Sequence, residues 1–311
     1  MKICFVGLGS IGIKHLKNIV SILKSKGIKY SIHALRKENK PINDDVSMEI
    51  SEVFTSYDQI PSDYDVIFIT NPTYLHYEAI YNLADKTKAM FIEKPLFESN
   101  KYSIDNIKFK ENGIQYVASP LRFHPTIQQA KKYVLQNKIY SFRAICSTYL
   151  PNWRKNTDYR KNYSAFKEMG GGVTLDLIHE WDYLIWLFGL PNKVSGYKTK
   201  VSHLQISSDD LSVYICSWPH HTGSLHLDYF GRVEKREIEF YTENDVVLFD
   251  IKNNQINYLN SGEIVSLPSL DYSSAEISYF INLVLGNYKN NINPPEDAFQ
   301  TLEISLKSEL V

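Results

Sequence analysis

The sequence predicts an α/β protein that begins with a doubly wound parallel sheet and continues into an α+β domain with a large, mostly antiparallel sheet. Three observations lead to this prediction. Strand-like runs alternate with helix-like segments up to about residue 119, a glycine-rich turn joins the first strand to the first helix, and strand-like runs dominate after about residue 139. Alternating strands and helices favour parallel pairing through right-handed crossovers, the arrangement of an open doubly wound sheet.

The first part of the chain opens with the apolar run KICFV at 2–6, and apolar side chains then recur at helical spacing from Ser10 onward. The run DVIFIT at 65–70 is continuously apolar, as expected for a strand that is buried on both faces. The other strands predicted here cover 30–35, 89–93 and 114–119, and helices are predicted over 73–84 and near 99–111.

The second part contains runs in which apolar and polar residues alternate, which is typical of half-buried antiparallel strands. These strands are predicted over 142–150, 211–218, 223–230, 236–242 and 246–250, and two helices, at about 273–286 and 296–310, close the chain. The change of pattern places the domain boundary near residue 120, which gives a first domain over 1–120 and a second over 121–311.

Composition excludes several classes of partner. The formal net charge is -1, with 22% charged and 43% hydrophobic residues, which argues against a large basic surface for nucleic acid or anionic lipid. No apolar stretch reaches the ~18 residues of a membrane span. The three cysteines lie far apart without a CxxC pair, so we expect a reduced chain in the cytoplasm. No metal site is predicted, because His220, His221 and His226 lack acidic or cysteine neighbours at ligand spacing.

The turn GLGSIG matches the pattern G-x-G-x-x-G at Gly7, Gly9 and Gly12. A strand precedes it and a helix follows, which is the context of a Rossmann dinucleotide site rather than of an ordinary strand-to-helix turn. In such a site the first glycine permits the tight turn, the second lets the backbone approach a pyrophosphate, and the third lets helix and strand pack closely. The amides at the helix start, at Ser10 and Ile11, would then hold the phosphates.

The end of the second strand bears on the choice between NAD and NADP. An NAD site usually places an acid there for the ribose hydroxyls. This chain has Arg36 and Lys37 instead, and Glu38 is the first acid. A guanidinium suits a 2′-phosphate, so the sequence favours NADP over NAD. Stacking on adenine and exposure to solvent remain the alternatives for Arg36.

Four further stretches follow in order: ITNPTYLHYEAI at 69–80, EKPL at 93–96, LRFHP at 121–125 and GGGVTLDLIHEWD at 170–182. Together with GLGSIG, they resemble the Gfo/Idh/MocA family of oxidoreductases through about Gly189. The resemblance implies an NAD(P)-dependent dehydrogenase or reductase that acts on CH-OH groups of sugars, sugar acids or nucleotide sugars. It also implies a C-terminal domain that binds substrate and forms a homo-oligomer, a dimer or tetramer, through its sheet.

The resemblance implies three catalytic residues. Lys94 would stabilise the developing negative charge on the reacting oxygen, His179 would exchange the hydroxyl proton, and Asp176 would orient histidine or substrate. The alternative is that Asp176 is a surface group and His179 a core histidine. Cofactor contacts are implied from Gly7, Gly9, Ser10, Ile11, Gly12, Arg36, Thr70, Asn71, Pro72, His76, Glu93 and Lys94, although His76 could instead pack at the start of its helix.

Asp176 and His179 are three residues apart, so we expect them on one face of a helix that begins at the glycine triplet. The glycines 170–172 would let backbone approach the substrate. Many family members space this pair by four residues, which leaves the detailed roles open. Glu180 and Asp182 are expected to be helix-surface charges or partners of the site residues.

The segment 151–164 carries aromatic and basic side chains before the glycines. Its stretch YLPNWR…DYR resembles a subgroup associated with bacterial surface-glycan synthesis. Arginine favours carboxylate or phosphate, which suits an acidic or nucleotide-linked sugar. Arg122 has an interdomain salt bridge as its alternative role. The predicted substrate contacts are Arg122, Trp153, Arg154, Tyr159 and Arg160.

Two other functions are compatible with the same fold. One is a catalytically silent dinucleotide-binding sensor or assembly protein, and the other is a lyase or hydrolase that retains its cofactor. Intact Lys94, Asp176 and His179 favour the dehydrogenase over the silent protein.

Overall fold

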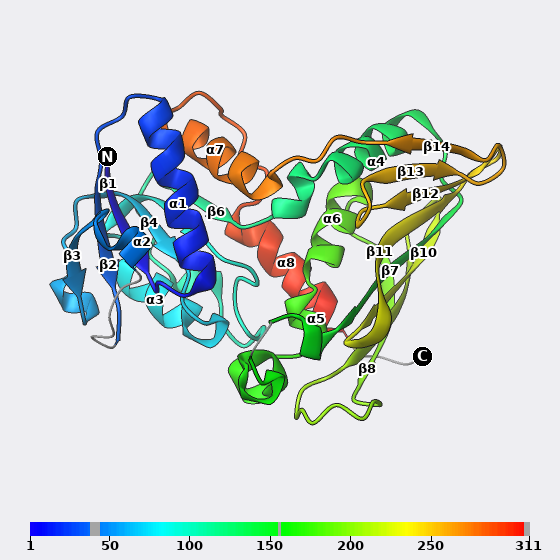
Figure 1. Ribbon diagram of the computed structural model, residues 1–311, viewed down its shortest axis with the longest axis horizontal. Coiled ribbons are helices and arrows are strands. Elements are labelled where there is room, and N and C mark those ends of the chain that lie inside the picture. Colours follow the sequence, from blue (N-terminus) through cyan, green and yellow to red (C-terminus); the bar gives the residue numbers. More distant parts are fainter. Residues whose placement is uncertain (38–43, 155–156, 308–311) are drawn as a thin grey trace. The chain divides into compact units, whose positions relative to one another are not determined.

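The computed structural model describes residues 1–37, 44–154 and 157–307. The chain forms two compact units. The first unit comprises Met1–Ala118 and Ser273–Phe299, and the second comprises Ser119–Tyr272 with the chain from Gln300 on. Figure 1 shows both units and labels most of their helices and strands. The predicted fold class is confirmed, because the first unit contains a six-stranded parallel sheet and the second a mostly antiparallel sheet of eight strands.

The strands of the first unit follow the order β3-β2-β1-β4-β5-β6, and every pairing is parallel. Their ends are in register: Val6 pairs with both Leu35 and Ile69, and Ile69 pairs with Ile92. The carboxyl ends of four strands therefore meet at one edge of the sheet, where open α/β folds bind ligands. The strands are β1 (Lys2–Val6), β2 (Ser31–Leu35), β3 (Ile50–Phe54), β4 (Tyr64–Ile69), β5 (Thr87–Ile92) and β6 (Ile114–Val117).

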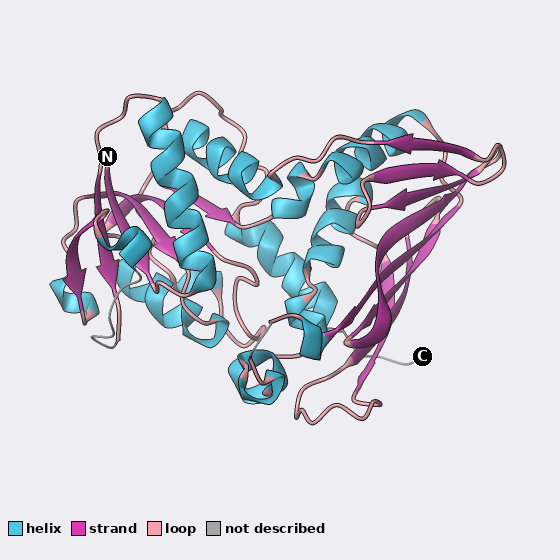
Figure 2. Cartoon of the chain, viewed as in Figure 1, coloured by secondary structure: helices cyan, strands magenta, loops and turns pink. Residues whose placement is uncertain are grey.

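Helices α1 (Ser10–Ser25), α2 (Asp44–Ser47) and α3 (His76–Leu83) connect these strands (Figure 2). Two sequence predictions differ from the structure here. The edge strand β3 was not predicted, because three of its five residues are exposed and the polar Ser51 and Glu52 interrupt its apolar residues. The helix predicted near 99–111 is wrong: the segment contains only a 3-10 turn at Ile104–Asn106, where the Ser103 hydroxyl accepts a hydrogen bond from the Asp105 amide. Serine competes in this way with helical hydrogen bonding.

Residues 273–299 return to the first unit, although the boundary near residue 120 places them in the second domain. The reason is the apolar face of α7 (Tyr272–Val284), which packs into the core of the parallel sheet. The Phe280 ring lies 5.3 Å from the Phe91 ring and 5.9 Å from the Phe68 ring. The Tyr116 hydroxyl also donates to Glu276 at 3.0 Å.

The sheet of the second unit has the strand order β14-β13-β12-β11-β7-β10-β9-β8. Strands β7 and β10 pair in parallel, while the other neighbouring strands in this sheet are antiparallel. The strands are β7 (Ser141–Tyr149), β8 (Lys193–Thr199), β9 (Leu211–Ser217), β10 (Thr222–Asp228), β11 (Phe230–Tyr241), β12 (Val246–Asp250), β13 (Gln255–Tyr258) and β14 (Glu263–Ser266).

Helices cover one face of this sheet (Figure 1). Trp181 and Leu184 of helix α6 are fully buried, and the Trp181 ring meets the Tyr214 ring edge-on at 5.0 Å. Strand β7 alternates buried with more exposed side chains, so its two faces differ in polarity, as predicted for half-buried strands. The helices are α4 (Pro125–Gln136), α5 (Val173–Asp176), α6 (His179–Phe188) and α8 (Pro295–Leu306), the last of which begins in the first unit.

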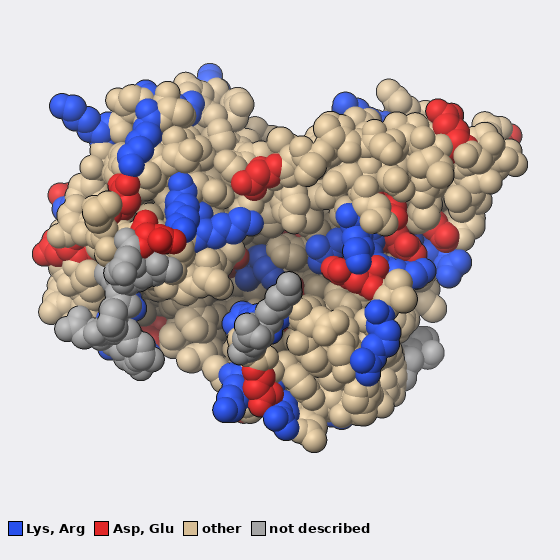
Figure 3. Space-filling view, viewed as in Figure 1, with Lys and Arg blue, Asp and Glu red and all other residues tan. Residues whose placement is uncertain are grey.

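The surface shown in Figure 3 carries basic and acidic side chains interspersed. Within residues 1–37, 44–154 and 157–307, no helix is both long enough and apolar enough to span a bilayer. The same residues contain no group of three or more His, Cys, Asp or Glu side chains that could hold a metal ion. The cysteines Cys4, Cys146 and Cys216 are buried and free.

Candidate active site residues in the two units

The glycine-rich turn is fastened to the end of β4. Gly7 has a φ of +90°, a conformation that L side chains rarely adopt. The Thr70 hydroxyl donates to the Gly7 carbonyl at 2.7 Å. A Cβ at Gly12 would lie 2.6 Å from the Gly7 carbonyl oxygen and 2.8 Å from the Thr70 hydroxyl, so no side chain fits there. Gly7 and Gly12 are thus required by the turn itself.

Gly9 is different. Its φ of -73° is open to any residue, and a Cβ there would meet no protein atom within 4 Å. The fold therefore does not require glycine at this position. Gly9 is also the N-cap of α1 and provides no side-chain cap, so the first amides of the helix, including those of Ser10 and Ile11, point outward without an intrahelical acceptor. An open glycine beside uncapped amides fits a dinucleotide pyrophosphate.

Arg36 follows β2 at the same sheet edge, because β2 ends in register with β1. Its amide donates to the Phe54 carbonyl at 2.9 Å, which fixes the backbone, and its side chain is partly exposed. Glu38, the first acid after the strand, lies outside the described residues. The preference for NADP stays a prediction.

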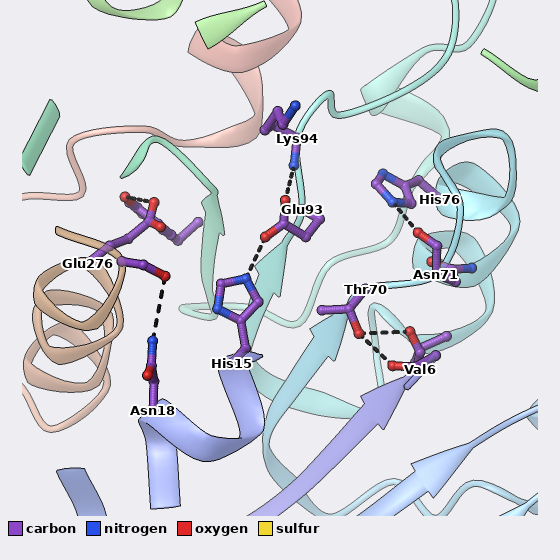
Figure 4. Close-up of polar contacts among 12 residues, drawn as sticks. Val6, His15, Asn18, Thr70, Asn71, His76, Glu93, Lys94 and Glu276 are labelled. Atoms are coloured by element: carbon purple, nitrogen blue, oxygen red, sulfur yellow. Dashed lines mark hydrogen bonds and ion pairs between the residues drawn. The ribbon is translucent and has the colours of Figure 1, made fainter. Parts of the chain in front are cut away.

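The loop after β4 is held by a buried histidine (Figure 4). His76, which is 1% exposed, places Nε2 3.0 Å from the Asn71 carbonyl and Nδ1 3.0 Å from the Pro95 carbonyl. Burial lowers the pKa of His76. The ring thus joins two loops that were both predicted to contact the cofactor, as a packing residue does. Pro72 precedes the 3-10 turn Thr73–Leu75, and the buried Asn71 Oδ1 has no hydrogen-bond partner among the described residues, which suits a polar ligand.

Glu93 forms a pair that the sequence analysis did not predict. Its Oε1 lies 2.5 Å from Nε2 of His15, which is 2% exposed, and its Oε2 accepts the Lys94 amide at 3.1 Å (Figure 4). Burial opposes ionisation of Glu93, but the His15 hydrogen bond and the nearby positive charge outweigh it and lower its pKa. His15 lies on α1, so this pair ties the dinucleotide helix to the loop that carries the predicted catalytic lysine.

In the second unit, the glycine triplet is a packing feature. A Cβ at Gly171 would overlap the Tyr163 carbonyl, and one at Gly172 would overlap the Asp209 carboxylate. All three glycines are buried, and Gly170 and Gly172 have positive φ values. The expectation that these glycines expose backbone to substrate is therefore wrong. They let the chain pass closely between the 163–166 turn and Asp209, which caps α5 by accepting from the Thr174 amide at 3.0 Å.

The expected single helix through Asp176 and His179 is also broken in two. Helix α5 ends at Asp176, Leu177 departs from helical geometry with ψ of 25°, and α6 begins at His179. Both side chains nevertheless line one cavity of about 240 Å³. The other residues that line it are Cys146, Thr148, Trp153, Leu177, Glu234, Lys235 and Arg236.

Two tyrosines orient Asp176, which is 5% exposed. The Tyr229 hydroxyl donates to Oδ2 of Asp176, and the Tyr163 hydroxyl also bonds this carboxylate. Burial, followed by the charge of Asp176, raises the pKa of both tyrosines, so they stay protonated as donors. Tyr229 follows β10 and was not singled out from the sequence, since nothing in its local pattern marks it.

The acids after His179 are buried and paired, and neither is a helix-surface charge. Glu180 is fully buried and forms an ion pair with Arg236, whose Nε lies 2.9 Å from Oε1 of the carboxylate. Asp182 accepts two hydrogen bonds from Arg122, at 2.8 and 3.1 Å, and Arg122 is 4% exposed. Arg122 therefore forms a salt bridge inside the second unit. A buried guanidinium held in this way can position α6, while its predicted contact with substrate stays a prediction.

The predicted substrate residues fall into two groups. Trp153 and Arg154 line a second cavity of about 450 Å³. Tyr159 and Arg160 belong to a local turn: Arg160 pairs with Asp158 at 2.8 Å, and the Tyr159 hydroxyl accepts the Gln205 amide at 3.2 Å. Neither Tyr159 nor Arg160 is among the residues that line these two cavities.

The glycines of the turn allow a matched test. Gly9→Ala should leave the free energy of unfolding within about 0.5 kcal/mol, because the new methyl group meets nothing, yet weaken NADH binding roughly tenfold or more. Gly12→Ala should cost about 1–3 kcal/mol of stability through overpacking. Urea unfolding and NADH fluorescence titration measure the two quantities. Unchanged NADH binding in Gly9→Ala would contradict the assignment.

Because the pKa of Glu93 is lower in the folded than in the unfolded protein, the ionised carboxylate stabilises the folded state. This stabilisation is fully present above the unfolded pKa of about 4.3 and is lost as the pH falls through the lower folded-state value. Wild type should therefore melt higher than Glu93→Gln at pH 7, and the difference should shrink on acidification. Thermal melts from pH 7 to pH 3 test this, with Glu111→Gln at an exposed position as the control. A difference that is constant with pH would contradict it.

Comparison with known proteins gives three results. Residues 1–108 match the family model GFO_IDH_MocA, described as an oxidoreductase family with an NAD-binding Rossmann fold. Levoglucosan dehydrogenase of Pseudarthrobacter phenanthrenivorans is 31% identical over 140 residues, which are 42% of this chain and 36% of that protein. The chain thus matches only about a third of that relative's length.

Solved structures share the fold over nearly the whole chain. The complex of levoglucosan dehydrogenase with NADH and levoglucosan superposes with a TM-score of 0.80 at 17% identity, covering 98% of this chain and 95% of that one. The WlbA dehydrogenase from Bordetella pertussis, in complex with NADH and UDP-GlcNAcA, gives 0.78 at 18% identity, covering 97% and 93%. Residues 1–108 therefore match the Gfo/Idh/MocA oxidoreductase family model, and sugar and inositol dehydrogenases are among the proteins to which the chain is similar.

Proposed function

We propose that this protein is an NAD(P)-dependent oxidoreductase that transfers hydride between nicotinamide and a CH-OH carbon of a sugar derivative. One observation carries the proposal. The fold does not require glycine at position 9, yet Gly9 lies beside uncapped helix amides at the carboxyl edge of a parallel sheet. This is the arrangement that a dinucleotide pyrophosphate requires. The cavity that contains Asp176 and His179 is the proposed site of the sugar.

The chain's own residues would act on the proton and on the oxygen of the substrate. In the oxidation direction, His179 takes the hydroxyl proton while the carbon gives up its hydride, for which the bound nicotinamide supplies the acceptor. The ammonium of Lys94 stabilises the negative charge that develops on the oxygen. Asp176, held by Tyr229 and Tyr163, keeps the histidine or the substrate hydroxyl in position.

The proposed substrates are sugars, sugar acids or nucleotide sugars, with a role in surface-glycan biosynthesis. This class is supported by the names of similar proteins, which include a levoglucosan dehydrogenase, a scyllo-inositol 2-dehydrogenase and a UDP-N-acetylglucosamine 3-dehydrogenase. A cavity lined by a carboxylate, an imidazole and an indole also suits a polyhydroxylated ring, since it offers both hydrogen-bonding groups and an apolar face.

The proposal also covers the oligomeric state of the protein and the compartment in which it works. We expect a homo-oligomer, a dimer or tetramer, that assembles through the outward face of the second sheet, where Ile215 and Val233 are 68% and 73% exposed. We also expect the protein to work in the cytoplasm, because the three cysteines are buried free thiols.

Two substitutions test the chemistry. Lys94→Ala and His179→Asn should each lower kcat by about 10²–10⁴-fold with a sugar that wild type oxidises, because both groups act in the transition state, and His179→Asn should retain its NADH affinity. His203→Asn, an exposed histidine of the second unit, is the control. Absorbance at 340 nm across a panel of sugars, sugar acids and nucleotide sugars measures turnover. Full activity in both variants would remove these residues from the mechanism.

Cofactor preference is tested at Arg36. We propose NADP(H) over NAD(H), because this guanidinium follows β2, where it can pair with a 2′-phosphate. Arg36→Ala should weaken NADPH binding by about tenfold or more and leave NADH binding nearly unchanged. Fluorescence titration of both cofactors against wild type and variant gives the comparison. Equal effects on the two cofactors would contradict the preference.

A further inference from the structure

The second cavity adjoins the cavity of Asp176 and His179. The two share Thr148, Trp153 and Glu234 as lining residues. The first cavity, at about 240 Å³, lies below the ~300–1,000 Å³ that is usual for ligand sites, whereas the second, at about 450 Å³, lies within it. A substrate whose reacting carbon sits beside His179 therefore has room for a further group on the far side of Trp153.

The wall between the two cavities is fixed. The Trp153 indole nitrogen donates to the Thr148 hydroxyl at 2.6 Å, and its ring meets the Tyr229 ring edge-on at 5.2 Å. Tyr229 in turn donates to Asp176. A ligand that spans both cavities would thus meet a preformed indole surface, which is 38% exposed, with no need to order a flexible side chain.

The charge of the second cavity is positive. Its charged lining residues are Arg154, Arg232 and Glu234. Glu234 is already paired with Lys252 at 2.9 Å, whereas within the described part of the chain neither arginine pairs with a carboxylate. Arg232 stacks 3.8 Å from the centre of the Tyr149 ring, which holds the guanidinium plane in one orientation. Two guanidinium groups beside one cavity match the oxygens of phosphate groups.

We propose that this second cavity binds the diphosphate of a nucleoside-diphosphate sugar, with Arg232 and Arg154 as its ligands, so that the sugar reaches Asp176 and His179. The inference rests on the proposed function for the identity of the reacting end. A single carboxylate would leave most of a 450 Å³ cavity unfilled, which favours the larger phosphate-bearing group. Arg232, on β11, is a specificity-determining residue in this assignment.

The test uses UDP as the probe and the NADH-loaded protein. Isothermal titration should detect UDP binding to wild type, and Arg232→Gln and Arg154→Gln should each weaken it by about 10–100-fold. Arg143→Gln, an exposed arginine of β7 that lines neither cavity, should bind UDP as wild type does. Absence of UDP binding by wild type, or UDP binding by both arginine variants as tight as that of wild type, would overturn the assignment. If glucuronic acid binds in a way that depends on these arginines and UDP does not bind, the cavity binds a carboxylate and the diphosphate assignment is wrong.

A kinetic measurement separates this inference from the proposed function. With UDP-N-acetylglucosamine, Arg232→Gln should raise KM about 10–100-fold and leave kcat within about threefold, because the group it binds lies away from the reacting carbon. UDP binding that depends on the arginines, without turnover of any sugar, would support the diphosphate subsite and contradict the proposed dehydrogenase activity. Turnover of neutral sugars that depends on His179, but is unchanged by added UDP and by Arg232→Gln, would support the dehydrogenase activity and contradict the diphosphate subsite.

Discussion

The register of the parallel strands is the constraint on which the first unit depends. Because Val6, Leu35, Ile69 and Ile92 end at one level, the segments that follow them reach the same edge of the sheet. The turn at that edge is then locked from two sides: Thr70 bonds the Gly7 carbonyl, and the His15–Glu93 pair joins the first helix to the strand that precedes Lys94. A rigid edge of this kind can present amides and an ammonium to a ligand without reorganising on binding, which is the basis of electrostatic preorganisation.

The second unit builds its site by a different means. Two ion pairs fix helix α6, whose first residue is His179: Arg122–Asp182 is buried, and Arg236–Glu180 joins a half-buried guanidinium to a buried carboxylate. Breaking either pair would leave an uncompensated buried charge, which is strongly destabilising, so each pair restricts the helix to one position. The tight passage at the glycine triplet then sets where α5 ends and Asp176 lies. The carboxylate and the imidazole share a cavity because of these tertiary contacts, since they do not lie on one continuous helix.

Sequence reasoning succeeded where a local pattern determines the structure. The buried strands are continuous apolar runs and the nucleotide turn has its glycines at fixed spacing, so the fold class and the dinucleotide turn could be predicted. It did not predict the features that depend on contacts between residues far apart in the sequence. The return of α7 depends on Phe280 meeting Phe68 and Phe91, and the break after Asp176 depends on the passage of the glycines beside Asp209. His15 and Tyr229 were missed for the same reason, because their partners Glu93 and Asp176 are 78 and 53 residues away.

The proposed function requires direct transfer of hydride between nicotinamide C4 and a substrate carbon. Transfer of deuterium tests it most directly. Cofactor that carries deuterium at nicotinamide C4 is incubated with the enzyme and the oxidised form of the sugar that shows turnover, and the reduced sugar is analysed by mass spectrometry. We expect a mass increase of about one unit on the carbon that bears the new hydroxyl, since the hydride comes from the cofactor. Reduced sugar that carries no label from either face of the nicotinamide would contradict it.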